Sequence, residues 1–327
     1  MSRRRRRFTA LALVACATAW PALAGPRPAA AHPDLSGAWS NASLTTQERD
    51  DAFKTLSVPD AEAAKYEKAH RGQPPEAPPG EDPVDGIKAE WWETDQGLAR
   101  IRGQVRTSWI VAPADGKRPF TAAAKAQNKA NRARSKLPPD NPEDRDRSER
   151  CVDDDGAGPP LDNGGYNDNY AFVQGPHELA IWAEWEHSVR IIRISEPGAP
   201  AAGHPPPGVR LHMGDSIGHW DGRTLVVETT NFTPGEVRAA DGDAAADMRV
   251  VERFTRLSPA EIFYEYAVTD PARYVGTWRA EQLLHPANGL IYEYACHEGN
   301  YGLANILAAA RRLEGRKIDG VAAAAGR

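Results

Sequence analysis

The run Cys296-His297-Glu298-Gly299-Asn300-Tyr301 concentrates side chains that can do chemistry. Histidine and glutamate can exchange protons with a bound molecule, and a cysteine thiolate is a nucleophile or a metal ligand. The run stands between an expected β-strand, Leu290–Cys296, and an expected helix after Tyr301. Such a junction holds side chains at the rim of a rigid framework. We therefore predict a site here.

Part of this run has a structural explanation. Gly299 fits a turn, Asn300 fits the N-cap of the following helix, and Cys296 fits a disulfide. His297 and Glu298 are not explained in this way. The partial positive charge of a helix N-terminus favours an anionic glutamate and a neutral imidazole, and a neutral imidazole can act as a base. We predict His297 and Glu298 as catalytic residues.

Two further polar residues are candidates for the same site. Strand alternation from Ile181 to Ile191 places His187 on the apolar face, either as a satisfied core residue or as a group inside a ligand cavity. Asp215 precedes a tight hairpin, where it either caps a turn or orients a catalytic histidine. We predict that His187 and Asp215 join His297 and Glu298.

The elements that must position these residues are mainly strands. Apolar runs separated by turn residues, with no helix-length connection between them, predict an antiparallel sheet that closes into a β-barrel or packs as a sandwich. A short C-terminal helix and a partly irregular N-terminal region complete this fold class. The predicted strands are Tyr170–Gln174, Glu178–Glu184, Ser188–Ile194, Thr224–Thr230, Met248–Arg256, Ile262–Val268, Thr277–Leu284 and Leu290–Cys296.

The N-terminus predicts export. The arginines of residues 3–7, an apolar run and the triplet Ala22-Leu23-Ala24 form a signal peptide, residues 1–24, so we expect a periplasmic or secreted protein. A lipoprotein with a lipid anchor at Cys16 is the alternative. The expected organisation continues with a tether (25–33), an N-terminal strand, helix and charged loops packing on the core (34–165), the β core (166–302) and a C-terminal helix and tail (303–327).

Charge narrows the class of partner. Removal of residues 1–24 takes away five arginines and no acids, and the formal charge moves from −5 to −10. An acidic protein argues against a nucleic-acid partner and against an anionic membrane surface. The apolar stretch of the leader is too short for a membrane span.

Two cysteines, Cys151 and Cys296, remain after the leader. In an oxidising compartment an even pair favours a disulfide. Closing so long a loop would contribute about 4–5 kcal/mol in the chain-entropy model, provided that the Cα atoms come close enough. A free thiolate at Cys296, acting as nucleophile or metal ligand, is the competing interpretation.

Several motifs together resemble a widespread group of uncharacterised exported bacterial proteins that end in Cys-His-Glu-Gly-Asn-Tyr. No activity carries over from that group. The short strands with Gly-x-Trp starts resemble lipocalin-like barrels, which hold apolar ligands and occasionally catalyse their isomerisation, hydration or cyclisation. The motifs are Glu184–Ile192, Gly214–Ser216, Trp220 with Thr224–Phe232, Val251–Phe254 and Tyr292–Tyr301.

These residues support an acid-base enzyme of isomerase, dehydratase or lyase type that acts on a small, fairly apolar molecule in a barrel pocket. His297 or His187 would move the proton, and Asp215 or Glu298 would orient it or act as the opposing acid. No cofactor is predicted. Zinc held by His187, His297 and Glu298, for assisted hydrolysis, is an alternative. A non-catalytic binding protein for a hydrophobic small molecule is another, and an interaction module that docks a partner through the charged central loop is a third.

Overall fold

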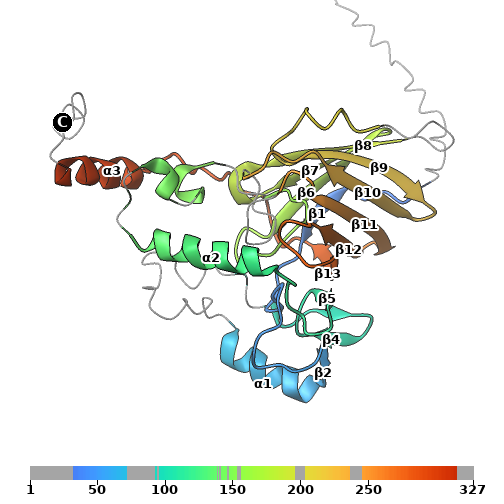
Figure 1. Cartoon of the computed structure of the whole chain (residues 1–327). Coiled ribbons are helices and arrows are strands. Elements are labelled where there is room, and N and C mark those ends of the chain that lie inside the picture. The colour runs from blue at the N-terminus through green and yellow to red at the C-terminus, as the bar shows by residue number, and fades with distance from the viewer. Residues whose placement is uncertain are drawn as a thin grey trace, which may run out of the picture. The chain divides into compact units, whose positions relative to one another are not determined.

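The computed structural model is mainly β, and a closed barrel is its largest element (Figure 1). It describes residues 32–71, 93, 96–137, 139, 141–145, 147–152, 156–195, 203–235 and 245–314. The predicted signal peptide, the Cys16 anchor and the tail after residue 314 lie outside these ranges. Within them, nine strands form the barrel: β1 (Gly37–Ser40), β6 (Asn169–Gln174), β7 (Glu178–Ala183), β8 (Val189–Ile194), β9 (Asp215–Asp221), β10 (Thr224–Thr230), β11 (Arg249–Ser258), β12 (Glu261–Thr269) and β13 (Trp278–Pro286).

The barrel closes because β1 pairs with both β6 and β13. Closure satisfies the backbone groups that an open sheet would leave at its edges. The predicted barrel is therefore confirmed, and the region 34–165 contributes a strand to it as well as packing on it. A short strand, β5 (Ile110–Ala112), pairs antiparallel with the start of β13, at Arg279 and Ala280.

One pair of strands departs from the expected antiparallel sheet, because β8 and β9 run parallel. The sequence pattern predicted the hairpin turn at Asp221-Gly222 but not that Asp215–Asp221 is a full strand. The connection from Ile194 to Asp215 is long enough to carry the chain back to the end of the sheet where β8 began.

The predicted last strand, Leu290–Cys296, is wrong. These residues form an irregular arm that ends in a turn. The preceding strand β13 already lies between β12 and β1, so the closed barrel offers no free edge to which another strand could add.

The predicted alternation from Ile181 to Ile191 also fails, at the corner between β7 and β8. Glu186 and His187 both have left-handed backbone, with φ of 52° and 61°. This corner resets the alternation, so that Ile181 is buried on β7 while Ile191 is exposed on β8. His187 is exposed instead of sharing the apolar face.

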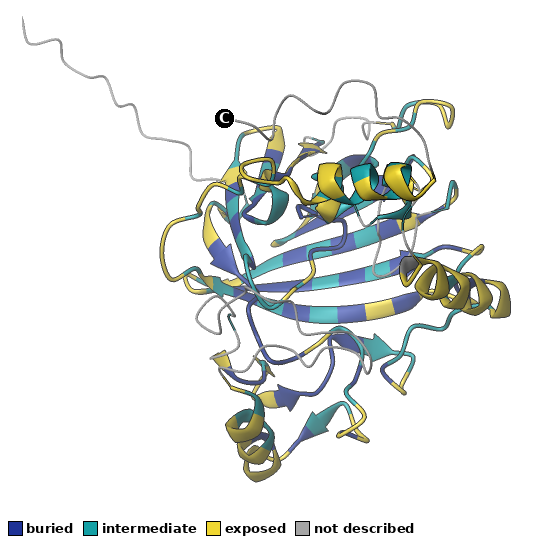
Figure 2. Cartoon of the chain, turned by 90° about the vertical axis from the view of Figure 1, so that its left-hand side faces the viewer, coloured by how far each residue is buried: buried dark blue, intermediate teal, exposed yellow. Residues whose placement is uncertain are grey.

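Buried and less buried residues alternate along the barrel strands (Figure 2). The inward side chains are largely aromatic and aliphatic. Phe254 stacks on Tyr264 and meets Phe172 edge to face. Residues 156–161 are buried too, and the backbone N–H of Leu161 donates to the Tyr264 hydroxyl at 3.0 Å. Side chains and this segment therefore fill space inside the barrel.

A small second core lies beside a three-stranded sheet of β2 (Ser57–Val58), β4 (Gln104–Arg106) and β3 (Arg100–Ile101). It is formed by Leu44, Phe53, Val58, Ala63, Leu98 and Val105. The helices are α1 (Asp60–His70), α2 (Ala122–Ser135) and α3 (Gly302–Leu313), with 3-10 turns at Pro142–Asp144, Ser148–Arg150 and Trp185–His187. Within the described ranges, no helix combines the length and the apolar character that crossing a membrane requires.

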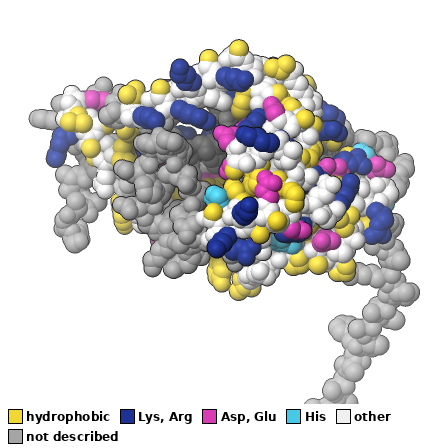
Figure 3. Space-filling model, turned by 90° about the horizontal axis from the view of Figure 1, so that it is seen from below, with side chains coloured by type: hydrophobic (Ala, Val, Ile, Leu, Met, Phe, Trp, Pro, Cys, Tyr) yellow, Lys and Arg dark blue, Asp and Glu magenta, His cyan; other side chains and the backbone are white. Residues whose placement is uncertain are grey.

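The surface carries charges of both signs. On the face drawn in Figure 3, basic, acidic and hydrophobic side chains are interspersed. Some of the charges are paired over long sequence distances, such as Arg118 with Glu48 at 2.7 Å and Arg106 with Glu281 at 2.7 Å. These pairs join the segments before β6 to one another and to the barrel.

Candidate functional site

The run Cys296–Tyr301 contributes Cys296, His297 and Glu298 to the lining of a cavity of about 430 Å³. No lining residue belongs to a strand of the barrel, so the cavity is not the barrel interior. It is built from three separate segments: Cys151 at the end of the 3-10 turn Ser148–Arg150, the β7–β8 corner and the arm after β13. The lining residues are Cys151, Glu186, Glu293, Tyr294, Ala295, Cys296, His297 and Glu298.

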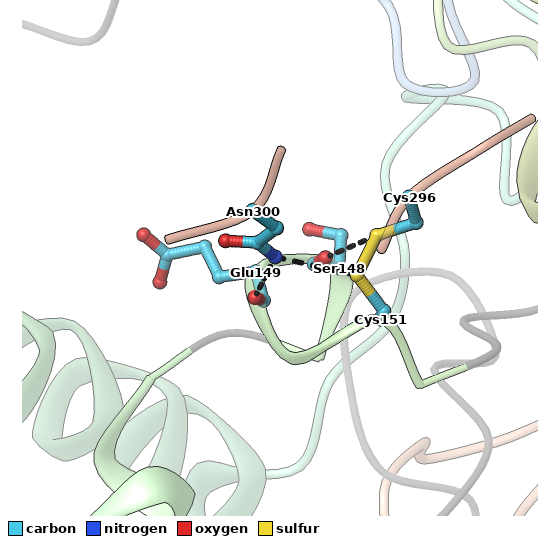
Figure 4. Close-up of a disulfide and its surroundings, with 5 residues drawn as sticks. All are labelled: Ser148, Glu149, Cys151, Cys296 and Asn300. Carbon is cyan, nitrogen blue, oxygen red and sulfur yellow. Dashed lines mark hydrogen bonds between the residues drawn. A yellow bond between two sulfur atoms is a disulfide. The ribbon is translucent and has the colours of Figure 1, made fainter. Parts of the chain in front are cut away.

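The predicted disulfide between Cys151 and Cys296 is present, with Cα atoms 5.6 Å apart. It fastens the arm to the 3-10 turn Ser148–Arg150 (Figure 4). The Asn300 side chain reinforces this link, since its Nδ2 donates to the Glu149 carbonyl at 3.1 Å. Both cysteines line the cavity, so the disulfide is part of its wall.

Asn300 therefore does not cap the last helix as predicted. The N-cap of α3 is Tyr301, without a side-chain hydrogen bond, and the helix begins at Gly302. The nearby 3-10 turn offers Asn300 a backbone carbonyl, and that contact takes the amide group away from the helix end. The predicted turn at Gly299 is confirmed, with φ of 70°.

His297 and Glu298 lie in the turn between Ala295 and Asn300, and both are exposed at the cavity. Backbone hydrogen bonds hold the turn: Glu298 N–H donates to the Ala295 carbonyl at 3.0 Å, and Asn300 N–H donates to the His297 carbonyl at 3.3 Å. Within the described residues, no hydrogen bond fixes the His297 ring. The disulfide and the turn position its backbone, while the side chain keeps rotamer freedom.

His187 lies beside the same cavity without lining it. Its Nδ1 accepts a hydrogen bond from the backbone N–H of Tyr294 at 3.3 Å, and its ring meets Trp182 edge to face at 4.9 Å. An accepting Nδ1 requires that a neutral imidazole carries its proton on Nε2. His187 thus couples the β7–β8 corner to the arm that carries His297.

Glu186 is a cavity residue that the sequence pattern missed. It sits at the left-handed corner next to His187, a backbone conformation that costs energy in residues other than glycine. Such outliers cluster at functional sites. A sequence signal exists in hindsight, because polar Glu184, Glu186 and His187 interrupt an otherwise strand-like run.

Two tyrosines near the cavity stay protonated over a wide pH range. Burial, together with Tyr294, Asp168 and Glu186, raises the pKa of Tyr166 to about 12. Burial, followed by the Glu186 carboxylate, also raises the pKa of Tyr294. Trp185 lies between these two rings, at 5.1 Å from Tyr166 and 5.3 Å from Tyr294. The phenol groups can therefore serve as hydrogen-bond donors.

Asp215 lies in a different cluster and does not line the cavity. It is buried at the start of β9, where Arg193 donates to both carboxylate oxygens at 2.8 and 2.9 Å. His204 Nδ1 lies 2.7 Å from the same carboxylate, and its Nε2 is 3.5 Å from Glu228. These partners are side chains, whereas the predicted turn cap would bond to nearby backbone amides, so Asp215 belongs to an ion-pair cluster outside the cavity.

The zinc alternative needs three ligands within reach of one ion. Among the residues that the structure describes, no group of three or more histidine, cysteine, aspartate or glutamate side chains is arranged to hold a metal. His297 and Glu298 share the cavity, while His187 contacts Tyr294 and Trp182. The zinc site stays a prediction without geometric support.

The site therefore brings together His297, Glu298 and, through Tyr294, His187, and it leaves Asp215 elsewhere. The resemblance to exported bacterial proteins stays a prediction. Comparison of the chain with protein-family models, with curated proteins and with solved structures finds no significant match.

Proposed function

We propose that this protein is an enzyme that transfers protons on a small molecule bound beside the Cys151–Cys296 disulfide. The observation that supports this is the shared cavity of His297, Glu298, Glu186 and Glu293. An imidazole among carboxylates can take a proton from one atom of a substrate while a second group returns one to another atom. Isomerisation, dehydration and lyase reactions all need this pair of steps.

We assign His297 as the residue that moves the proton. Glu298 is its sequence neighbour in the same turn and Glu186 reaches the cavity from the β7–β8 corner, so either carboxyl can act as the opposing acid. His187 is a positioning residue, because its ring acts on the arm through the backbone of Tyr294. The disulfide pre-organises the arm, which lowers the entropic cost of aligning the groups.

The cavity is of the size that small-molecule sites have, which is roughly 300–1,000 Å³. Its walls combine carboxylates with the apolar surfaces of Ala295 and the disulfide. We therefore infer a substrate with an apolar body and a polar or hydrogen-bond-donating end, bound outside the barrel strands. The disulfide and the leader sequence support an oxidising location, the periplasm or the cell exterior.

The test does not require knowledge of the natural substrate. An enzyme that removes a proton from carbon also exchanges that proton with solvent. We would incubate the protein in D₂O with pooled carbonyl, hydroxy-acid and alkene compounds and follow deuterium incorporation by mass spectrometry. We expect incorporation into one chemical series, and its loss in His297→Ala and in Glu186→Gln.

His219→Ala is the matched control, because His219 is exposed on β9 and is not a lining residue of the cavity. It should retain the full exchange rate. An exchange rate that is unchanged in His297→Ala would contradict the assignment.

A non-catalytic binding protein is the second candidate. The observation that favours it is the absence of an orienting hydrogen bond on the His297 ring among the described residues, since a general base usually has one. In that case a compound from the same pools would raise the melting temperature of the wild-type protein without exchanging protons. His297→Ala would then weaken binding only modestly.

A further inference from the structure

The cavity of the proposed site has walls that carry negative charge. Three of its lining residues are glutamates from two segments: Glu186 from the β7–β8 corner, and Glu293 and Glu298 from the arm after β13. No lysine or arginine is among the lining residues, all of which belong to the described part of the chain. The other polar side chains in the wall are those of His297 and Tyr294. Such a wall attracts cations and repels anions.

The two carboxylates of the arm are not neutralised by a basic side chain. Within the described ranges, neither Glu293 nor Glu298 forms an ion pair or a side-chain hydrogen bond. Other glutamates of the chain are paired, such as Glu48 with Arg118 and Glu281 with Arg106, each at 2.7 Å. The charges of the arm are therefore available to a bound molecule.

The negative field reaches the aromatic rings beside the cavity. Burial raises the pKa of Tyr294, and the Glu186 carboxylate is the next cause. Burial is also the largest cause that raises the pKa of Tyr166 to about 12, and Asp168 and Glu186 are among the further causes. Since a nearby negative charge opposes the ionisation of a phenol, both tyrosines indicate the same sign of charge around the site.

The cavity also offers apolar and aromatic surface beside these carboxylates. Ala295 and the sulfur atoms of the disulfide contribute to the wall, and so does Tyr294. Trp185 packs against the Tyr294 ring, with the ring centroids 5.3 Å apart. An aromatic ring next to carboxylates suits an alkylated ammonium group, because the ring face attracts the cation while the alkyl carbons pack on the ring.

We propose that this cavity takes a small organic cation, either an amine in its ammonium form or a quaternary ammonium compound. The inference rests on the proposed function, because it names the substrate class of the same cavity. Among the described residues, no group of three or more acidic, histidine or cysteine side chains is arranged to hold a metal ion. An organic cation needs no such convergence, since its charge is spread over a larger surface. His297 lines the same wall and can reach the carbon body of the bound molecule.

The experiment measures binding, and not turnover, on the mature chain with its disulfide intact. The probes are choline and dimethylbutanol, in which a carbon atom replaces the charged nitrogen. Butylammonium and butanol form a second pair for a primary amine. We expect each cation to bind about tenfold more tightly than its neutral counterpart, because one exposed carboxylate contributes a factor of roughly two to three and three act together. Isothermal titration calorimetry measures both affinities, and added salt should weaken only the binding of the cation.

Charge variants locate the binding site. Glu293→Gln should weaken choline binding by about the factor of two to three that one carboxylate contributes, and Glu293→Lys should abolish the preference over dimethylbutanol. Glu293 is exposed, and circular dichroism confirms that both variants fold. Glu62→Gln is the matched control, because Glu62 is exposed on α1 and is not a lining residue of the cavity. It changes the net charge equally and should bind choline as the wild type does.

Several results would overturn the cation proposal. Equal binding of cation and neutral counterpart is one, and no binding of either pair is another. Equal losses in Glu62→Gln and Glu293→Gln would place binding elsewhere, and binding of Zn²⁺ without binding of choline or butylammonium would indicate a metal site instead.

The deuterium-exchange test of the proposed function stays independent of these measurements. Binding of the cations without exchange in any compound would contradict proton transfer and leave the cation site standing. Exchange confined to neutral or anionic compounds, with no binding of the cations, would contradict the cation site and leave proton transfer standing.

Discussion

Arg190 and Glu252, 62 positions apart in the sequence, form a doubly hydrogen-bonded ion pair, with distances of 2.7 and 2.9 Å. Their side chains are 2% and 0% exposed. The Tyr264 hydroxyl also donates to Glu252, at 2.8 Å. Burial alone would lower the pKa of Arg190, but the Glu252 carboxylate outweighs it, and the pKa is raised. The pair ties β8 to β11 in the barrel interior.

Removal of one partner should destabilise the barrel strongly. We expect Glu252→Leu to lose about 3–5 kcal/mol of unfolding free energy, because it leaves the Arg190 charge buried without a counter-charge. The double variant Arg190→Met with Glu252→Leu should recover most of the loss, since it leaves neither charge inside. Urea denaturation of the three proteins measures both effects. Equal losses in the single and double variants would mean that packing, and not charge, dominates here.

This pair also shows how far the sequence predicts the fold. Alternating apolar residues and turn signals predict most strands of the barrel, because each strand must bury one face. The same alternation, carried through Glu186 and His187, puts Arg190 on the outside. Two left-handed residues at the corner shift the alternation of inward and outward side chains by one residue. Nothing in the pattern of apolar residues signals a backbone turn of that kind.

The sequence predicted the local part of the candidate site but not the part that the fold brings in from elsewhere. His297, Glu298 and the disulfide belong to one local run, and residue type alone identifies them. Glu186 comes from a corner more than 100 positions earlier and reaches the cavity only through the closure of the barrel. Asp215 was predicted at the site on residue type, but Arg193 and His204 already satisfy its carboxylate.

His285 should make stability depend on pH. It lies in β13 where that strand pairs with β1 to close the barrel, opposite Ser40. Burial, partly offset by Glu261, lowers the pKa of His285 below its ordinary value of 6.5. Below pH 6.5 the unfolded chain therefore binds the proton more readily than the folded chain does, and stability falls as the pH decreases.

The test compares the wild type with His285→Gln, which cannot titrate. Between about pH 7 and about pH 5, we expect the wild type to lose more unfolding free energy than the variant. Urea denaturation at several pH values measures the difference between the two curves, in which the contributions of all other groups cancel. Parallel curves would show that the pKa of His285 is the same in the folded and unfolded chains.

Loss of the Cys151–Cys296 disulfide should release the arm before it affects the barrel. The bridge spans 145 positions, and the chain-entropy model assigns about 5 kcal/mol to a loop of this size. We expect Cys151→Ser with Cys296→Ser to cost less than this. Without the bridge, the arm and α3 can detach while the strands stay paired. The folded state then gains chain entropy as well as the unfolded state, so the difference between them changes by less.

Amide hydrogen exchange distinguishes local release from global loss. In the double serine variant, exchange should accelerate over residues 290–314 and stay slow in β11 to β13. A variant that exchanges faster throughout the barrel would contradict local release. Asn300→Ala, which removes the contact to Glu149 but keeps the disulfide, should produce a smaller acceleration over the same residues.

The left-handed backbone at Glu186 should reverse the usual preference for alanine over glycine. At φ of 52°, a Cβ atom costs about 1 kcal/mol or more, whereas glycine adopts this conformation freely. We therefore expect Glu186→Gly to be more stable than Glu186→Ala by about 1 kcal/mol in urea denaturation. Glu293 lines the same cavity but is not among the residues with positive φ, so there the glycine variant should be the less stable one. If alanine were more stable than glycine at both positions, the corner would relax at no cost, and Glu186 would need no left-handed backbone to reach the cavity.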